Sequence, residues 1–301
     1  MGLTLMITGA GGFLGRAVVA EAQERGHEVR ALTRDDLDLS SGALPALDGV
    51  DCVVHLAGSL SGDWSVQARD TVEATRGVIE AMQAQPLPPR LVMASSIAVY
   101  SADAKGVVTE ATPLEDRPDR RDAYARAKLA QEEMLRGSGV RHTILRPGAI
   151  LGPDRVTTAH LGPAAGGTLI LMERGGEVPA VSLADCARAF VLAAEMPGEG
   201  RALNIIGADR PTRARYAAAL RRTGWPRRVL PLNWRLVMPL AWLLSPLGAR
   251  LPGLLRPAVL RARMRPVCYD IAAAKVALDW QPQDDFETAF SRAVEGADIR
   301  P

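Results

Sequence analysis

Tyr124 and Lys128 form the pair of residues in this 301-residue chain most suited to proton transfer. They stand four positions apart in a stretch of helical pattern, so both side chains lie on one face of the expected helix. A cation beside a phenol favours the phenolate, and we therefore expect Lys128 to lower the pKa of Tyr124 from about 10 towards neutrality. A tyrosine with a lowered pKa is a usable general acid or base.

A hydroxyl group at the end of a predicted strand completes this candidate catalytic set. Ser96 follows the apolar run 91–95 and would stand at the carboxyl edge of a sheet, where open α/β folds bind their ligands. Its hydroxyl could hydrogen-bond a substrate carbonyl and polarise it, whereas Ser95 is expected to point the other way. Ser96, Tyr124 and Lys128 together predict acid–base chemistry on a carbonyl group.

A glycine-rich turn lies near the start of the chain. Gly9, Gly12 and Gly15 follow a short apolar run directly and open a helical pattern, at G-x-x-G-x-x-G spacing. Glycines at such a turn let the backbone approach a pyrophosphate, and the free N–H groups of the helix N-terminus attract the anion. Because the turn is the first strand–helix connection of a βαβ series, the spacing predicts a dinucleotide site.

The end of the second predicted strand, 28–33, selects among dinucleotides. An acidic residue there would bond the ribose 2′-hydroxyl of NAD, whereas an arginine accommodates the 2′-phosphate of NADP. Arg34 follows the strand, and Arg16 offers a second cation, so we favour NADP(H). Asp35 and Asp36 come next, which keeps NAD(H) open. The residues placed to meet the adenine ring are Asp38 and Leu39.

Strands and helices alternate along the first half of the chain. Apolar strand-like runs fall at 3–8, 28–33, 51–57, 91–95 and 141–145, and helical patterns at 14–22, 64–84 and 122–135. Such alternation implies a parallel sheet covered by helices on both faces. We predict a Rossmann-like, doubly wound α/β fold with a dinucleotide-binding domain over 1–165. A small, mostly helical substrate lobe would follow over 166–301, with some segments returning to the first domain and helices near 184–195, 213–223 and 286–295.

Composition excludes several classes of protein. Hydrophobic residues make up 48% and charged residues 23% of the chain, which is typical of globular proteins. The longest charge-free apolar stretch in the last third, 236–249, is shorter than the ~20 residues that span a bilayer. The N-terminus has no signal-peptide pattern, so we expect a cytoplasmic protein. Cys52, Cys186 and Cys268 are expected to be buried free thiols, and no residue spacing indicates a metal site.

Charge is distributed unevenly. Residues 201–265 contain 14 arginines, no lysine and one acidic residue, Asp209, whereas the whole chain carries +2. A solvated arginine-rich face explains this pattern, and so does a surface for phosphates or anionic lipid, because basic and apolar residues are interleaved. Peripheral contact with the inner membrane surface is thus one of two open interpretations, beside the solvated face. No nucleic-acid recognition motif accompanies the arginines, and we expect no nucleic acid to bind.

Together the motifs resemble those of the extended short-chain dehydrogenase/reductase superfamily, in its nucleotide-sugar epimerase/dehydratase-like branch. The matches run from residue 6 to about residue 280. Besides the glycine turn, they are Asp51 with His55-Leu56-Ala57-Gly58, Ser95-Ser96-Ile97-Ala98-Val99-Tyr100, Thr109-Glu110, Tyr124-Ala125-Arg126-Ala127-Lys128, Arg146-Pro147 with Gly152-Pro153, and Ala184-Asp185.

The resemblance implies further roles. Lys128 would also hydrogen-bond the nicotinamide ribose, and His55 and Arg146 are expected to be structural. A homodimer formed through two helices of the sheet domain is expected by analogy. The other cofactor contacts that we infer are Gly11, Phe13, Leu14, Leu56, Ala57, Gly58, Tyr124 and Pro147.

Three reactions of this superfamily compete. A 4,6-dehydratase would carry an Asp-Glu pair after the active-site hydroxyl, where this chain has Ile97-Ala98. A nucleotide-sugar epimerase or reductase needs the same Ser–Tyr–Lys set and stays open, although Gly148-Ala149 replace the asparagine that often follows the Arg-Pro pair. Reduction of a carbonyl, or oxidation of the alcohol, needs only the Ser–Tyr–Lys set and the dinucleotide site that the sequence already contains.

We predict an NADP(H)-dependent oxidoreductase that acts on a small, bulky hydrophobic carbonyl substrate. The stretch 229–260 is rich in Leu, Pro and Trp within the basic region, a composition that suits a lipophilic ketone. A redox-sensing regulatory or assembly protein without turnover is a further alternative. Such proteins usually lose the tyrosine or the lysine, and both are present here.

Overall fold

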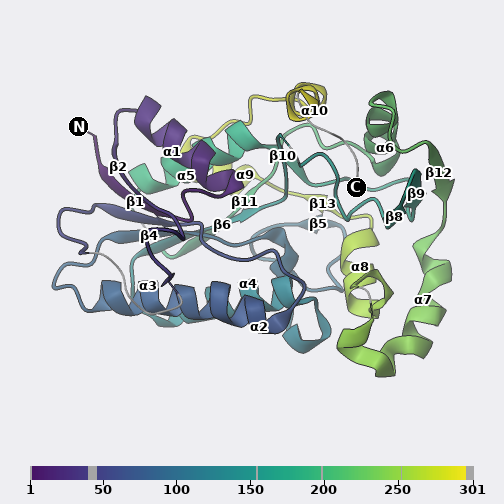
Figure 1. Cartoon of the computed structure of the whole chain (residues 1–301), viewed down its shortest axis with the longest axis horizontal. Helices are drawn as coiled ribbons and strands as arrows, with labels where there is room; N and C mark the ends of the chain where they lie inside the picture. Colours follow the sequence, from purple (N-terminus) through teal and green to yellow (C-terminus); the bar gives the residue numbers. More distant parts are fainter. Residues whose placement is uncertain (1, 40–45, 154, 198, 252, 296–301) are drawn as a thin grey trace.

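Six parallel strands form the central sheet of the molecule (Figure 1). The computed structural model describes residues 2–39, 46–153, 155–197, 199–251 and 253–295. In spatial order the strands are β11 (Arg201–Ile205), β6 (His142–Pro147), β4 (Arg90–Ala94), β3 (Cys52–His55), β1 (Thr4–Thr8) and β2 (Glu28–Leu32). This order, with β2 and β3 on opposite sides of β1, is the doubly wound Rossmann-like arrangement that the alternating pattern predicts.

Helices cover both faces of the sheet (Figure 1). One face carries α1 (Phe13–Glu24), α5 (Leu183–Glu195) and α9 (Ala272–Leu278). The other carries α2 (Trp64–Gln67), the π-helical segment η2 (Ala68–Glu73), α3 (Ala74–Gln83) and α4 (Ala123–Gly137). Successive strand residues serve the two layers in turn: Leu5 and Ile7 belong to the cluster under α5, and Met6 packs with Val78 of α3. Both faces are buried, so the strands are apolar throughout.

Short elements build the C-terminal lobe. They are β7 (Ala149–Leu151), β8 (Ala164–Ala165), β9 (Thr168–Leu171), β10 (Ala180–Ser182), α6 (Arg213–Arg222), β12 (Arg228–Pro231), α7 (Trp234–Leu244), η5 (Ser245–Arg250), η6 (Gly253–Leu255), α8 (Pro257–Met264) and α10 (Phe286–Val294). The chain returns to the sheet domain between these segments, because β11 pairs with β6 and α5 packs on α1. The remaining short elements, β5 (Val107–Val108) with β13 (Cys268–Tyr269), and the 3-10 turns η3 (Ile97–Val99) and η4 (Pro118–Arg120), join the two parts.

Most predicted elements are found within one to three residues of their expected bounds. The apolar runs became β1, β2, β3, β4 and β6, and the helical patterns became α1, the run α2–η2–α3, α4, α5, α6 and α10. The patterns did not indicate α7, α8 and α9. Cys52 and Cys186 are buried free thiols as expected, but Cys268 is exposed, because it lies in the two-residue strand β13 at the surface.

A buried ion pair joins α4 to the sheet. Arg146 on β6, 1% exposed, donates to the two carboxylate oxygens of Glu132 at 2.9 and 2.7 Å. Ser95 donates to the same carboxylate at 2.5 Å, and a further Arg146 nitrogen donates to the Tyr100 hydroxyl at 2.9 Å. Burial opposes ionisation of Glu132, yet the Arg146 guanidinium holds the pKa of this carboxyl below its ordinary value. Arg146 is therefore structural, as expected.

Replacing Glu132 by Leu should lower the free energy of unfolding by roughly 3–5 kcal/mol, because Arg146 would be left charged and unpaired in the core. The midpoint of urea denaturation at unchanged slope measures this loss. Arg136→Gln is the matched control: it removes the half-exposed partner of the same carboxylate and should cost at most ~1 kcal/mol. Equal stability of Glu132→Leu and the parent chain would contradict the structural role.

Candidate active site

A groove crosses the carboxyl ends of β1, β3 and β4. Its outer cavity, toward β2, has a volume of about 360 Å³, and its inner cavity, toward β6, about 420 Å³. The two cavities meet at Gly9, Gly12, Leu56 and Gly58, which line both. This is the topological switch point of the sheet, where doubly wound folds bind dinucleotides.

The glycine turn at the junction fits a pyrophosphate. Gly9 has a φ of +70°, and a Cβ there would lie 2.8 Å from the Ala57 nitrogen. A Cβ on Gly15 would lie 2.0 Å from the Gly9 oxygen, so neither glycine can be replaced without moving the backbone. Gly12 caps α1 without a capping bond from any described side chain, which leaves the first N–H groups of the helix to meet an anion.

The outer cavity carries the residues that we expect to select the dinucleotide. Arg34 lines it with its side chain 73% exposed and forms an ion pair with Asp70 of η2 at 3.2 Å. Asp36 accepts hydrogen bonds from the Thr33 nitrogen and hydroxyl at 2.8 and 2.6 Å, which lower the pKa of its carboxyl and close the turn. Arg16 donates to the Gly11 oxygen and is not among the described residues that line either cavity. Arg16, the second cation that we expected beside the dinucleotide, is thus bonded within the glycine turn.

All fifteen predicted cofactor-binding residues line one cavity or the other. The predicted lining of the inner cavity is Gly9, Gly12, Phe13, Leu14, Gly15, Leu56, Gly58, Tyr124, Lys128 and Pro147, and that of the outer cavity adds Gly11, Arg34, Asp38, Leu39 and Ala57. Ser96 is not among the described lining residues, whereas its neighbour Ser95 is. Ser96 is instead connected to the site by its hydrogen bond to Tyr124.

Tyr124 and Lys128 point into the inner cavity from the first turns of α4. Lys128 Nζ lies 5.9 Å from the centre of the Tyr124 ring and donates to the Ala94 carbonyl at 2.7 Å. Burial raises the pKa of Tyr124, and the hydrogen bond to Ser96 opposes this rise. Our expectation that Lys128 lowers the pKa of Tyr124 is therefore wrong for this structure. The nearby arginines Arg155 and Arg263 supply the positive charge that acts on the phenol.

A buried hydrogen-bond chain supports Lys128 from below. Lys128 Nζ donates to Gln131 Oε1 at 2.9 Å, and Gln131 Nε2 donates to the Thr75 hydroxyl. Thr75 also bonds His55 Nε2 at 2.9 Å, and His55 Nδ1 bonds the Thr8 hydroxyl at 2.8 Å. Burial, with the Lys128 charge, lowers the pKa of His55 to about 3, so this imidazole stays neutral and structural. The chain joins Lys128 to the end of β1, beside the glycine turn.

Two functional residues were missed by the sequence reasoning. Gln131 stands three positions after Lys128, a spacing that places both on one helix face and could have indicated their contact. Arg155 lines the inner cavity with its guanidinium 4.5 Å from the centre of the Phe13 ring. Its position shortly after Gly152-Pro153 was a signal, although only the fold brings it to Phe13.

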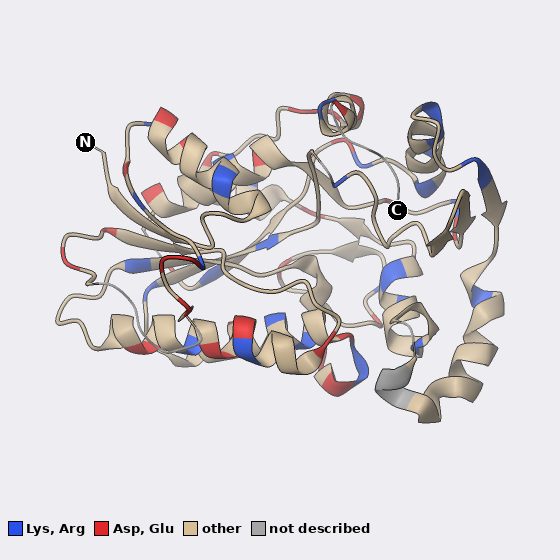
Figure 2. Cartoon of the chain, in the orientation of Figure 1, with Lys and Arg blue, Asp and Glu red and all other residues tan. Residues whose placement is uncertain are grey.

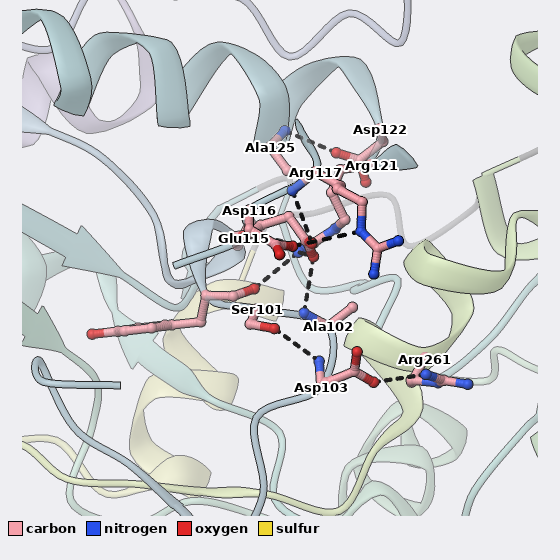
Figure 3. Close-up of polar contacts among 12 residues, drawn as sticks. Ser101, Ala102, Asp103, Glu115, Asp116, Arg117, Arg121, Asp122, Ala125 and Arg261 are labelled. Atoms are coloured by element: carbon pink, nitrogen blue, oxygen red, sulfur yellow. Dashed lines mark hydrogen bonds and ion pairs between the residues drawn. The ribbon is translucent and has the colours of Figure 1, made fainter. Parts of the chain in front are cut away.

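Ion pairs attach the start of α4 to the lobe. Figure 3 shows Asp122, whose carboxylate accepts from the Ala125 nitrogen at 2.9 Å and so caps the helix that carries Tyr124. Asp122 also accepts from Arg263 of the lobe at 2.8 Å. Asp103 accepts from Arg261 at 2.6 Å in the same region (Figure 3). The lobe therefore holds the loop that leads from Ser96 to Tyr124.

Residues 5–206 match the NAD dependent epimerase/dehydratase family. The chain belongs to this family. Family members and neighbours are NAD(P)-dependent enzymes, and the cofactor is accordingly a nicotinamide dinucleotide. In the described ranges, no cluster of His, Cys, Asp and Glu could hold a metal ion, and no described helix has the length and apolarity to cross a membrane.

Two curated relatives of this epimerase/dehydratase-family chain are reductases. Cinnamoyl-CoA reductase 1 of Arabidopsis thaliana is 28% identical over 50% of this chain and 54% of its own length. The chain thus matches only about half the length of that relative. 2-Alkyl-3-oxoalkanoate reductase of Stenotrophomonas maltophilia is 27% identical and covers 96% of this chain and 98% of its own.

Solved structures share the fold of this family member over nearly its whole length. MoeE5 in complex with UDP-glucuronic acid and NAD superposes with a TM-score of 0.71 at 20% identity, covering 97% of this chain and 98% of its own. Human epimerase family protein SDR39U1 with NADPH superposes with a TM-score of 0.67 at 20% identity, covering 97% and 99%. Neighbours of this fold therefore hold either form of the dinucleotide.

Lys128 should titrate well below the ordinary range of a lysine side chain. Burial lowers its pKa to about 8, so the ammonium is charged below that pH and loses its proton as the pH rises through it. The chain has three lysines, Lys105, Lys128 and Lys275, so protein labelled with ε-13C lysine gives three signals. One signal should shift with a midpoint near pH 8, and it should be absent in Lys128→Met. Three midpoints at the ordinary value would show that Lys128 is not desolvated.

Proposed function

We propose that this protein is an NADP(H)-dependent short-chain dehydrogenase/reductase that reduces the carbonyl of a bulky hydrophobic substrate, or oxidises the corresponding alcohol. One observation carries the proposal: Tyr124 and Lys128 line the inner end of the dinucleotide groove, one turn apart on α4, and the neighbouring Ser96 hydroxyl acts to lower the pKa of the Tyr124 phenol. Similarity to 2-alkyl-3-oxoalkanoate reductase over 96% of the chain supports it, because that name describes a ketone with alkyl substituents.

In the proposed mechanism the chain's own residues handle the carbonyl oxygen. The bound nicotinamide supplies the hydride in reduction or accepts it in oxidation. Ser96 Oγ donates a hydrogen bond to the carbonyl oxygen and polarises it, and Tyr124 Oη transfers its proton to that oxygen as the alcohol forms. The raised pKa of Tyr124 keeps the phenol protonated at neutral pH, so reduction begins from the form that holds the proton. Lys128 Nζ holds the ribose, and Arg155 and Arg263 supply the positive charge that favours the phenolate that remains.

Replacing Tyr124 by Phe should lower the rate of carbonyl reduction by about 10²–10⁴-fold, because the proton donor is lost while the ring remains. Steady-state oxidation of NADPH with a panel of lipophilic ketones and aldehydes measures the rate. The dissociation constant for NADPH, from fluorescence titration, should change less than about twofold, since binding of NADPH does not need the Tyr124 hydroxyl. Lost NADPH binding with an unchanged rate constant would contradict the assigned role.

Arg34 carries the proposed preference for NADP(H). Its guanidinium lies at the outer cavity, where an adenosine 2′-phosphate would be placed, and the Asp36 carboxylate is engaged by its own turn. Asp70 already pairs with Arg34, so the phosphate would have to compete with this carboxylate.

Replacing Arg34 by Ala should therefore weaken NADPH binding by about 10–100-fold, the loss of a charged hydrogen bond, and leave NADH nearly unchanged. Paired fluorescence titrations with the two cofactors give the ratio. Arg69→Ala is the matched control, because Arg69 pairs with the same Asp70 but is not among the described residues that line the groove. Equal weakening of both cofactors by Arg34→Ala would refute the preference.

The alternative reaction uses the same residues. A nucleotide-sugar epimerase or reductase also needs Ser96, Tyr124 and Lys128, and turnover of a UDP-sugar with none of the ketone panel would favour it. Tight NADPH binding without any turnover would favour a redox-sensing regulatory or assembly role.

We further propose a cytoplasmic protein that acts on small molecules and not on nucleic acid. We propose that it forms a homodimer and contacts the inner membrane surface through its basic, apolar region.

A further inference from the structure

Helix α7 and the turn after it present an apolar face to the outside. The face consists of four leucines at helical spacing, Leu236, Leu240, Leu243 and Leu247, with Trp242 beside this row; their exposed fractions lie between 49% and 76%. The opposite side of α7 holds the helix on the lobe through the buried Trp234 and Ala241. We call the exposed set the α7 face.

This concentration is unusual within the molecule. Seven of the twelve exposed large hydrophobic residues in the described ranges fall within 230–247. The others, such as Leu87 before β4 and Val276 on α9, stand singly on separate elements. Scattered exposed hydrophobics need no explanation, whereas a contiguous apolar patch marks an interaction surface.

Arginines without acidic partners lie just before α7 and in its first turn. Residues 210–265 contain no Asp or Glu, and Figure 2 shows only basic colour on α6, β12 and α8. Arg227, Arg228 and Arg235 are exposed and form no ion pair with any described carboxylate. By contrast, Arg261 and Arg263 are used internally, on Asp103 and Asp122.

We propose that the α7 face inserts into the interface of a membrane that contains anionic phospholipids, with Arg227, Arg228 and Arg235 on the headgroups. A helix with a row of exposed leucines, a neighbouring exposed tryptophan and arginines near its start has the composition that lies in a bilayer interface. Negative headgroups add attraction for each exposed arginine. The inference names the surface for the membrane contact proposed above, and it is independent of which carbonyl compound is reduced.

Charge decides against a second copy of the chain as the occupant of this face. A two-fold interface places the same patch on both partners, so the unpaired arginines of one copy would lie near those of the other. Like charges held together in a desolvated interface are unfavourable. An anionic lipid surface supplies the opposite charge and an apolar layer at once.

A further cavity adjoins the α7 face. It has a volume of about 460 Å³ and lies between the loop before α4 and the lobe, with Trp242 and Ser245 in its lining. Its lining is mixed: Leu251 and Pro257 stand beside arginines and three carboxylates, Asp103, Glu115 and Asp119. Because Arg261 already pairs with Asp103, the cavity offers an apolar space beside Trp242 and not an anion site.

Sedimentation with lipid vesicles tests the proposal on the full chain with NADPH bound. Vesicles of equal parts phosphatidylglycerol and phosphatidylcholine should bind at least about tenfold more tightly than phosphatidylcholine alone. Raising the salt from roughly 0.1 M to 1 M should weaken the binding, because headgroup attraction is screened. Trp242 is the exposed tryptophan of the face, so its emission should shift to the blue and be quenched by brominated lipid, and Trp242→Phe should remove that change.

Matched variants separate the α7 face from other exposed groups. The triple variant Leu236→Ser, Leu240→Ser, Leu243→Ser should bind anionic vesicles at least about tenfold more weakly, whereas Leu87→Ser with Val276→Ser should stay within about twofold. Arg227→Gln, Arg228→Gln, Arg235→Gln should abolish the preference for phosphatidylglycerol, and Arg141→Gln, at the far end of β6, should not. An unchanged NADPH dissociation constant shows that each variant is folded.

Three outcomes would overturn the proposal. They are no binding to anionic vesicles, binding that survives the triple leucine variant, and a dimer in solution that the same variant dissociates, which would assign the face to a second copy. Reduction of a water-soluble ketone, assayed without vesicles, tests the proposed function separately. Activity with lost vesicle binding refutes this inference alone, and vesicle binding without activity refutes the proposed function alone.

Discussion

A single buried carboxylate holds the candidate active site together. Glu132 lies four residues after Lys128 on α4, and it receives Arg146 from β6 and Ser95 from the end of β4. Because a buried charge is tolerated only when it is paired, these bonds fix the position of α4 along the strands of the sheet. Tyr124 and Lys128 project from the same helix, so the ion pair sets their distance from the strand ends and from Ser96.

Desolvation then determines the protonation state of each group. Tyr124 keeps its proton because burial raises its pKa, whereas burial lowers the pKa of Lys128 to about 8 and that of His55 to about 3. The neutral His55 is useful as a support, since it can bond Thr75 and Thr8 without adding charge beneath the groove. The site thus combines a protonated phenol with an ammonium of lowered pKa above a neutral hydrogen-bond chain.

The C-terminal lobe positions the start of α4 on one side and presents an exposed apolar face on the other. Arg261 holds the loop through Asp103 (Figure 3), and Arg263 holds the N-terminus of α4 through Asp122, so both arginines help to position the active site. Arg227, Arg228 and Arg235 are instead exposed, near the leucines of α7. The basic segment therefore has more than one physical role, since the buried Arg213 donates to backbone carbonyl groups inside the lobe.

The sequence by itself determined five strands of the sheet, the helices α1 to α5 that cover it and the glycine turn of the groove, whereas β11 and α9 had no signal in the pattern. Strand and helix periodicities are local, and the glycine turn, Tyr124 and Lys128 follow from spacing within one element or one connection. Only the tertiary structure decided the partners of these residues. Lys128 bonds Gln131 and Ala94, and the positive charge acting on Tyr124 comes from Arg155 and Arg263, which lie far along the chain and oppose the nearer carboxylate of Asp122. Spacing cannot show this, because desolvation and long-range charge depend on what the folded chain packs around each group.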